Sequence, residues 1–167
     1  LGFLFILLLS LLLTGVYTYY LESIGKAANG VLTDNYRSIK SGEQMLVSLS
    51  KMDQMVARIA LEQGYNDTIL WDIIQKEEVL FEKYLAVAEE TSLDSVEWEL
   101  VVRIKDNWEK RKAETHRLTT FYDNKKLYFS EIQRFSDAIR EACVALIDLN
   151  HALTQSKYNM VQQLYQE

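Results

Sequence analysis

The chain has 167 residues, a formal net charge of −6, one cysteine and no proline. An apolar content of 49% excludes a disordered chain, and the acidic balance argues against nucleic acid as the main partner. The single Cys143 excludes an internal disulfide and a zinc site built from cysteines. Absent proline and only six glycines favour long helices over many short strands.

The first segment carries no charged side chain through residue 21. Its apolar run is close to the length that crosses a bilayer, so we predict a transmembrane helix over residues 1–20. Three tyrosines between residues 17 and 20 stand where an interfacial aromatic belt would lie. The alternative is a cleaved signal peptide, but these bulky tyrosines occupy the place of its small-residue cleavage site. Because the chain starts at Leu1 and not at Met, we expect a short basic flank before it. The absence of Lys and Arg before Lys26 predicts an extracytoplasmic location for residues 21–167.

The apolar pattern continues at a spacing of three and four residues and predicts that this first helix runs on to about Gly64. Nine of the twelve positions in this seam are apolar, and the three exceptions are consecutive. We interpret the exceptions as a buried polar layer, which in a coiled coil can set register and partner number. The seam comprises Leu21, Ile24, Ala28, Val31, Asn35, Ser38, Gly42, Met45, Leu49, Met52, Val56 and Ile59.

Three further helices are predicted, over about 68–90 after an Asp67 N-cap, over about 95–119, and from near Ser130 to the end. Ser130 and Gln133 are expected to form a capping box, and residues 122–125 a loop. The inward side chains expected in 68–90 are Ile69, Ile73, Leu80, Tyr84 and Val87. In 95–119 they are Trp98, Val101, Ile104, Trp108 and Leu118. In the last helix they are Ile132, Phe135, Ile139, Ala142, Leu146, Leu149, Leu153, Ser156 and Met160.

These elements predict an all-α fold, an antiparallel up-down four-helix bundle with long first and last helices. At 1.5 Å per residue the first helix extends about 65 Å beyond residue 20, whereas the second and third reach only about 35–38 Å. The first helix is expected to be continuous with the transmembrane helix. The unequal lengths leave a two-helix stem whose apolar face a second copy would cover, so we expect a homodimer.

Motifs for catalysis are absent from the sequence, and we expect neither a cofactor nor a metal. His116 and His151 stand alone and are interpreted as surface or packing histidines. Residues 67–99 carry a net charge of −8 and residues 103–117 a net charge of +3. We interpret these segments as complementary faces of neighbouring helices, with a docked anion or protein as the alternative.

The polar layer is the candidate functional site. If the last helix enters the membrane just after Glu167, Arg37 lies at the height of His151, so residues 148–151 share a layer with residues 35–38. The layer could set the register, act as a switch, or bind a small anion at Arg37. The candidate residues are Asn35, Tyr36, Arg37, Ser38, Gly42, Asn150 and His151.

The chain resembles the extracytoplasmic four-helix sensor domain of bacterial transmembrane sensor histidine kinases. The resemblance rests on the architecture, on the string Asp34-Asn35-Tyr36-Arg37-Ser38-Ile39, and on Asp148-Leu149-Asn150 followed by Ala152 and Lys157. It implies an inner-membrane receptor whose second membrane helix, linker and kinase core follow this domain. The sequence holds no phosphoacceptor histidine box and no ATP-binding glycine box, so this part is expected to supply the signal input of a dimeric kinase. A chemoreceptor input domain and a membrane-tethered adaptor are the alternatives.

Overall fold

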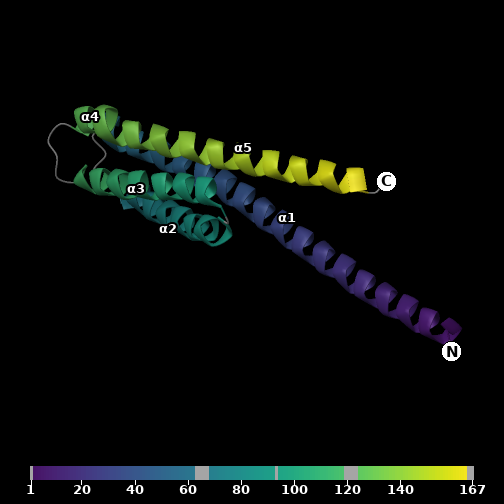
Figure 1. Cartoon of the computed structure of the whole chain (residues 1–167). Coiled ribbons are helices and arrows are strands. Elements are labelled where there is room, and N and C mark those ends of the chain that lie inside the picture. The colour runs from purple at the N-terminus through teal and green to yellow at the C-terminus, as the bar shows by residue number, and fades with distance from the viewer. Residues whose placement is uncertain (1, 63–67, 93, 119–123, 165–167) are drawn as a thin grey trace. The chain divides into compact units, whose positions relative to one another are not determined.

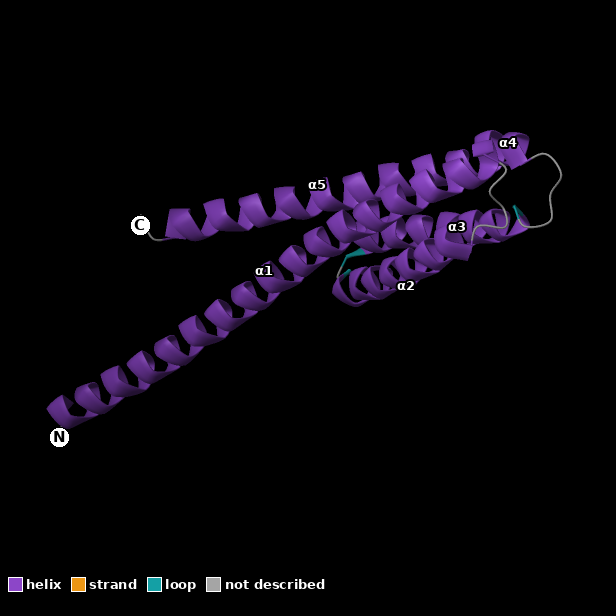
Figure 2. Cartoon of the chain, turned by 180° about the vertical axis from the view of Figure 1, so that it is seen from behind, coloured by secondary structure: helices purple, strands orange, loops and turns teal. Residues whose placement is uncertain are grey.

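The computed structural model of the protein describes residues 2–62, 68–92, 94–118 and 124–164 (Figure 1). These residues form α1 (Gly2–Glu62), α2 (Thr68–Thr91), α3 (Ser95–Arg117), α4 (Asn124–Leu127), a π-helical turn (Tyr128–Ile132) and α5 (Gln133–Leu164). Figure 2 shows only helices and short loops in the described part of the chain. The all-α prediction is confirmed.

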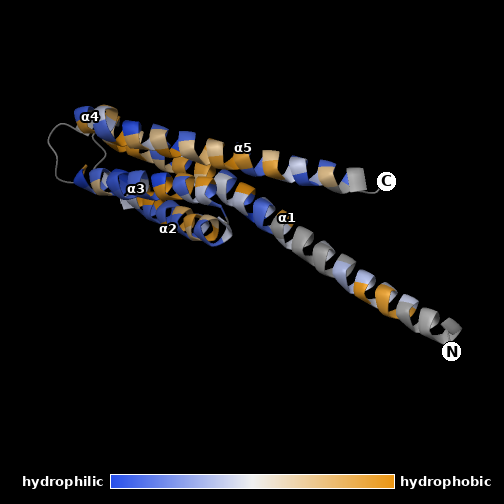
Figure 3. Cartoon of the chain, in the orientation of Figure 1, coloured by the Kyte–Doolittle hydropathy of each residue, from blue (hydrophilic) through white to orange (hydrophobic). Residues whose placement is uncertain are grey.

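The chain divides into two compact units, Leu1–Asp34 and Asn35–Glu167. In the first unit, the side chains of residues 10–20 are all exposed, and Figure 3 shows hydrophobic residues in this part of α1. Within the described residues, no helix combines the length and apolar content of a membrane span. The transmembrane helix over residues 1–20 therefore stays a prediction.

In the second unit, α1 buries its seam as predicted. Every seam position from Asn35 to Ile59 is buried, and α1 is unbroken over 61 residues. The side chains of the four earlier seam positions lie outside the described residues, as do the expected helix end at Gly64 and the Asp67 cap. The 3–4 spacing thus predicted the correct inward face of α1 from Asn35 to Ile59, the part of the seam whose side chains are described.

The predicted inward face of α2 is wrong. The side chains that were expected inside are half-buried or exposed, and Ile69 is 71% exposed. The buried apolar side chains are each one residue further along, at Leu70, Ile74, Phe81, Leu85 and Ala88. The helix carries apolar residues on two adjacent stripes, and Phe81 decides between them by stacking on Trp108 at a ring-centroid distance of 4.1 Å.

Helix α3 begins and packs largely as expected. Asp94 is its N-cap, since the side chain accepts hydrogen bonds from the backbone N–H groups of Val96 and Glu97. Trp98 was expected inside but is 50% exposed. The other four predicted inward residues of this segment, Val101, Ile104, Trp108 and Leu118, are buried.

The last helical segment begins at Asn124 rather than Ser130, so the expected capping box is wrong. Ser130 lies inside the π-helical turn, where the Gln133 N–H bonds the Tyr128 carbonyl. Of the loop expected over 122–125, the first two residues lie outside the described part and the last two are helical.

Along α5, Ile139, Ala142 and Leu146 are buried as predicted, and Ile132 in the preceding turn is buried too. Phe135, Leu149 and Leu153 are half-buried, whereas Ser156 and Met160 are exposed, contrary to the prediction. Two apolar clusters form the core of the second unit. The larger one draws residues from α1, α2, α3 and α5, including Met45, Phe81, Trp108 and Ile139. The second includes Val56, Leu70, Leu118 and Ile132.

Candidate functional site

The polar layer joins α1 to α5. Asn150 Nδ2 donates a hydrogen bond to Ser38 Oγ at 3.1 Å and another to its own helix at the Leu146 carbonyl, 3.0 Å away. Both Ser38 and Asn150 are fully buried. The expected sharing of a layer between residues 148–151 and residues 35–38 is therefore confirmed for this pair.

A fourth polar residue extends the layer. Asn35 Nδ2 donates to Thr154 Oγ1 at 3.4 Å, and that hydroxyl donates to the Asn150 carbonyl at 2.8 Å. Thr154 was not among the candidate residues predicted from the sequence. Its position four residues after Asn150 could have indicated that it belongs to the layer, since residues four apart lie on one helix face. We refer to Asn35, Ser38, Asn150 and Thr154 as the polar layer.

The hydrogen bonds of this layer are incomplete. Asn150 Oδ1 is buried and has no hydrogen-bond partner among the described residues. Leaving a buried acceptor unsatisfied costs about 1–3 kcal/mol. The layer is thus a weak point in the contact between α1 and α5.

Gly42 contributes close packing rather than polarity. A Cβ atom at this position would lie 2.7 Å from Ile147 Cγ1, closer than real Cβ contacts allow. The absence of a side chain lets α5 approach α1 here. Gly42 therefore sets the separation of α1 and α5 beside the polar layer.

The other three candidates lie outside the layer. Tyr36 and His151 are exposed, and Arg37 forms an ion pair with Glu90 of α2 at 2.8 Å. An anion bound at Arg37 would have to compete with this carboxylate. The anion site stays a prediction.

A second polar cluster was not anticipated from the sequence. Asp53 Oδ1 of α1 accepts hydrogen bonds from Arg111 Nη2 of α3 and Ser136 Oγ of α5, both at 2.8 Å. Asp53 Oδ2 accepts one from Arg140 Nη2 at 2.9 Å. Arg111 Nε also donates to Ser136 Oγ at 2.8 Å. We call these four residues the Asp53 clamp.

Arg111 is the unexpected member of the clamp. Its side chain is fully buried, and its guanidinium lies 5.8 Å from the Trp108 ring centroid. In the sequence it counted as one of the basic residues on the surface of the third helix. Its position in the core pattern of α3, between Trp108 and Thr115, was the only signal available.

The charged faces of α2 and α3 meet, as the sequence predicted. Lys105 pairs with Glu89 at 2.6 Å and Lys112 with Glu82 at 2.8 Å. His116 Nε2 lies 4.0 Å from Glu78 Oε2. Burial raises the pKa of Glu78, and the neighbouring positive charges oppose this rise. An anion docked at Lys105 or Lys112 would have to compete with these carboxylates.

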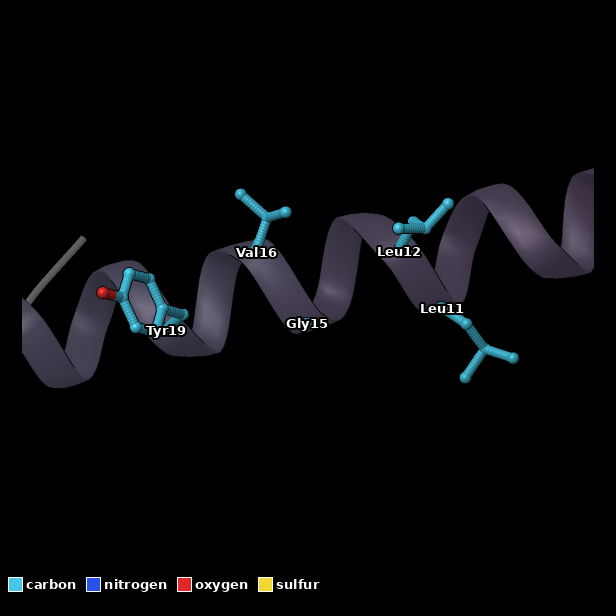
Figure 4. Close-up of a pocket in the computed structure, with 5 residues that line it drawn as sticks. All are labelled: Leu11, Leu12, Gly15, Val16 and Tyr19. Carbon is cyan, nitrogen blue, oxygen red and sulfur yellow. The ribbon is translucent and has the colours of Figure 1, made fainter.

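Among the residues that the structure describes, no cluster of three or more His, Cys, Asp or Glu side chains could hold a metal ion. Burial raises the pKa of Cys143 to about 12, which makes its thiol a poor nucleophile. An apolar depression lies on the first unit between Leu11, Leu12, Gly15, Val16 and Tyr19 (Figure 4), and all five residues belong to α1.

Comparison of the chain with protein-family models, curated proteins and solved structures found no significant match.

Proposed function

We propose that this chain is the signal-input domain of a membrane-anchored two-component sensor histidine kinase. Residues 1–20 would anchor it in the inner membrane of a bacterium, and residues 21–167 would lie outside the cytoplasm. The observation that carries the proposal is the incompletely bonded polar layer between α1 and α5. The stimulus would change the packing of α5 against α1, and a kinase core elsewhere in the receptor would respond.

The physical basis is the discreteness of helix packing. Packed interfaces have alternative arrangements and do not deform continuously, so a small shift at one contact can bias a whole helix. A layer with an orphaned acceptor at Asn150 costs little to rearrange, because an altered packing can give that oxygen a partner. An apolar seam of the same length would favour a single packing.

The proposed domain is an antiparallel up-down four-helix bundle that pairs with a second copy. The order of contacts supports the antiparallel arrangement. Along α1, Asn35, Ser38 and Asp53 contact residues of falling number on α5, namely Thr154, Asn150 and Ser136. Likewise, Lys105 and Lys112 of α3 pair with Glu89 and Glu82 of α2. A second copy would cover apolar surface that α1 and α5 leave open.

The test measures basal kinase output in membranes. Full-length protein in native membrane vesicles is incubated with labelled ATP, and acid-labile phosphohistidine is quantified. We expect labelling in the wild type and a clear change, about threefold or more, when Asn35→Leu and Ser38→Ile replace the layer with apolar side chains. Ser41→Ala is the matched control, because Ser41 is buried on the same helix but its hydroxyl donates only within α1, to the Arg37 carbonyl.

Three outcomes would count against the proposal. Labelling that is identical in the wild type and the double variant would remove the switch role of the layer. Absent phosphohistidine with methylated glutamates would indicate a chemoreceptor. Absence of both modifications would indicate a tethered adaptor.

A further inference from the structure

The contact between α1 and α5 has two polar sites of opposite character. At the Asp53 clamp, both carboxylate oxygens have donors, and the four bonds span 2.8–2.9 Å. At the polar layer, the two bonds between the helices measure 3.1 and 3.4 Å, and Asn150 Oδ1 has no partner among the described residues. One site is fully satisfied and the other is not.

The two sites lie far apart on the same pair of helices. Eighteen residues separate Asn35 from Asp53 along α1, which corresponds to about 27 Å at 1.5 Å per residue. We propose that the Asp53 clamp is the fixed end of the contact and that the polar layer is the end at which α5 separates from α1. The motion of α5 is then a pivot about the clamp rather than a slide along α1. The use of this pivot in signalling rests on the proposed function.

The free-energy cost of separating α1 from α5 differs between the clamp and the layer, and this difference decides which end opens. Separating the helices at the clamp would strip the carboxylate from Arg111, a guanidinium with no exposed surface. Separating them at the layer admits water to Asn150 Oδ1, which gains a partner. Opening is therefore costly at the clamp and cheap at the layer.

Gly42 belongs to the end that opens. It lies on α1 between the layer and the clamp, and Ile147 of α5 occupies the space that a side chain at this position would need. A displacement of 1 Å at the layer needs a rotation of only about 2° about the clamp over the 27 Å that separates them. A small tilt is thus enough to break the two hydrogen bonds between the helices at the layer while the bonds of the clamp persist.

Distances between spin labels would measure the motion directly. Labels at Tyr36 and His151 report on the layer, and labels at Gln54 and Gln133 report on the clamp. All four side chains are exposed, and each helix carries its two labels 18 residues apart, so both pairs view the contact from the same side. The full chain, with Cys143→Ala and in bilayer nanodiscs, is diluted with unlabelled protein so that labels on two copies do not interact.

We expect a distance distribution about twofold broader for the layer pair than for the clamp pair. Asn150→Leu should narrow the layer distribution, because the orphaned acceptor is gone. Asp53→Asn should broaden the clamp distribution, whereas Asp137→Asn, which removes only an exposed neighbour of Arg140, should not.

Equal widths at the two ends in the wild type, or a broader clamp, would overturn the pivot. This comparison of wild-type distances stands even if Asp53→Asn prevents folding. It is also independent of kinase output. A negative phosphorylation assay with unequal widths would reject the proposed function alone, and equal widths with normal labelling would reject the pivot alone.

Discussion

Asp53→Ala should be among the most damaging single substitutions in the second unit. The buried Arg111 guanidinium would keep only Ser136 and the weak contact with Met52 as hydrogen-bond partners. Removing one partner of a buried ion pair costs about 3–5 kcal/mol, because the remaining charge is uncompensated. We therefore expect the free energy of unfolding to fall by about that amount. Arg140→Ala removes an arginine that is 45% exposed from the same carboxylate and should cost only about 0.5–1 kcal/mol.

A double variant tests the reason for this cost. Arg111→Met replaces the guanidinium with an apolar side chain that suits the core. Added to Asp53→Ala it should restore stability, because no unpaired charge remains inside. The double variant should thus be more stable than Asp53→Ala alone. Urea unfolding of the full chain in mild detergent, followed by circular dichroism and by tryptophan fluorescence, measures all three variants.

A loss of less than about 1 kcal/mol in Asp53→Ala, the range of an exposed ion pair, would contradict a buried pair between Asp53 and Arg111. A further loss of stability on adding Arg111→Met to Asp53→Ala would show that the two residues act separately. Asp137→Ala is the control, because this carboxylate is 60% exposed and contacts the same Arg140.

Four other substitutions or treatments test further features. Gly42→Ala should destabilise the chain by about 1–3 kcal/mol, since its Cβ would collide with Ile147. Gly30→Ala meets nothing within 4 Å and should stabilise α1 by about 0.5–1 kcal/mol, and the same urea unfolding measures both glycine variants. Because burial raises the pKa of Glu78 above 4.5, its stabilising protonated form is lost as the pH rises through that raised pKa. Glu78→Gln should therefore be more stable than the wild type near pH 7, and this difference in stability should vanish near pH 4. Urea titrations at several pH values measure the difference. A difference that is constant with pH would contradict the burial of the Glu78 carboxylate as its cause. Cys143, with a pKa of about 12, should react with a thiol reagent at least about 100-fold more slowly in buffer than in urea.

The sequence alone determined the helical character of the chain and the inward face of α1. Proline is absent, and α1 has one dominant seam, so the 3.6-residue period admits a single answer for which side is buried. The same period identified the polar exceptions at Asn35 and Ser38. The predicted height of the last helix above the membrane placed Asn150 in the layer of Ser38. The start of α3 near residue 95 was also predicted from the sequence, and the structure shows that Asp94 caps it.

Tertiary structure decided the features that depend on a distant partner. Helix α2 has two adjacent apolar stripes, so its own sequence could not choose between them, and the stacking of Phe81 on Trp108 of another helix made the choice. Arg111 looked like a surface base because its carboxylate, Asp53, lies 58 residues away along the chain. A charged side chain enters the core only where such a partner meets it there. The periodicity of one helix carries no information about the contact between Arg111 and Asp53, because that contact forms only when α1, α3 and α5 pack together.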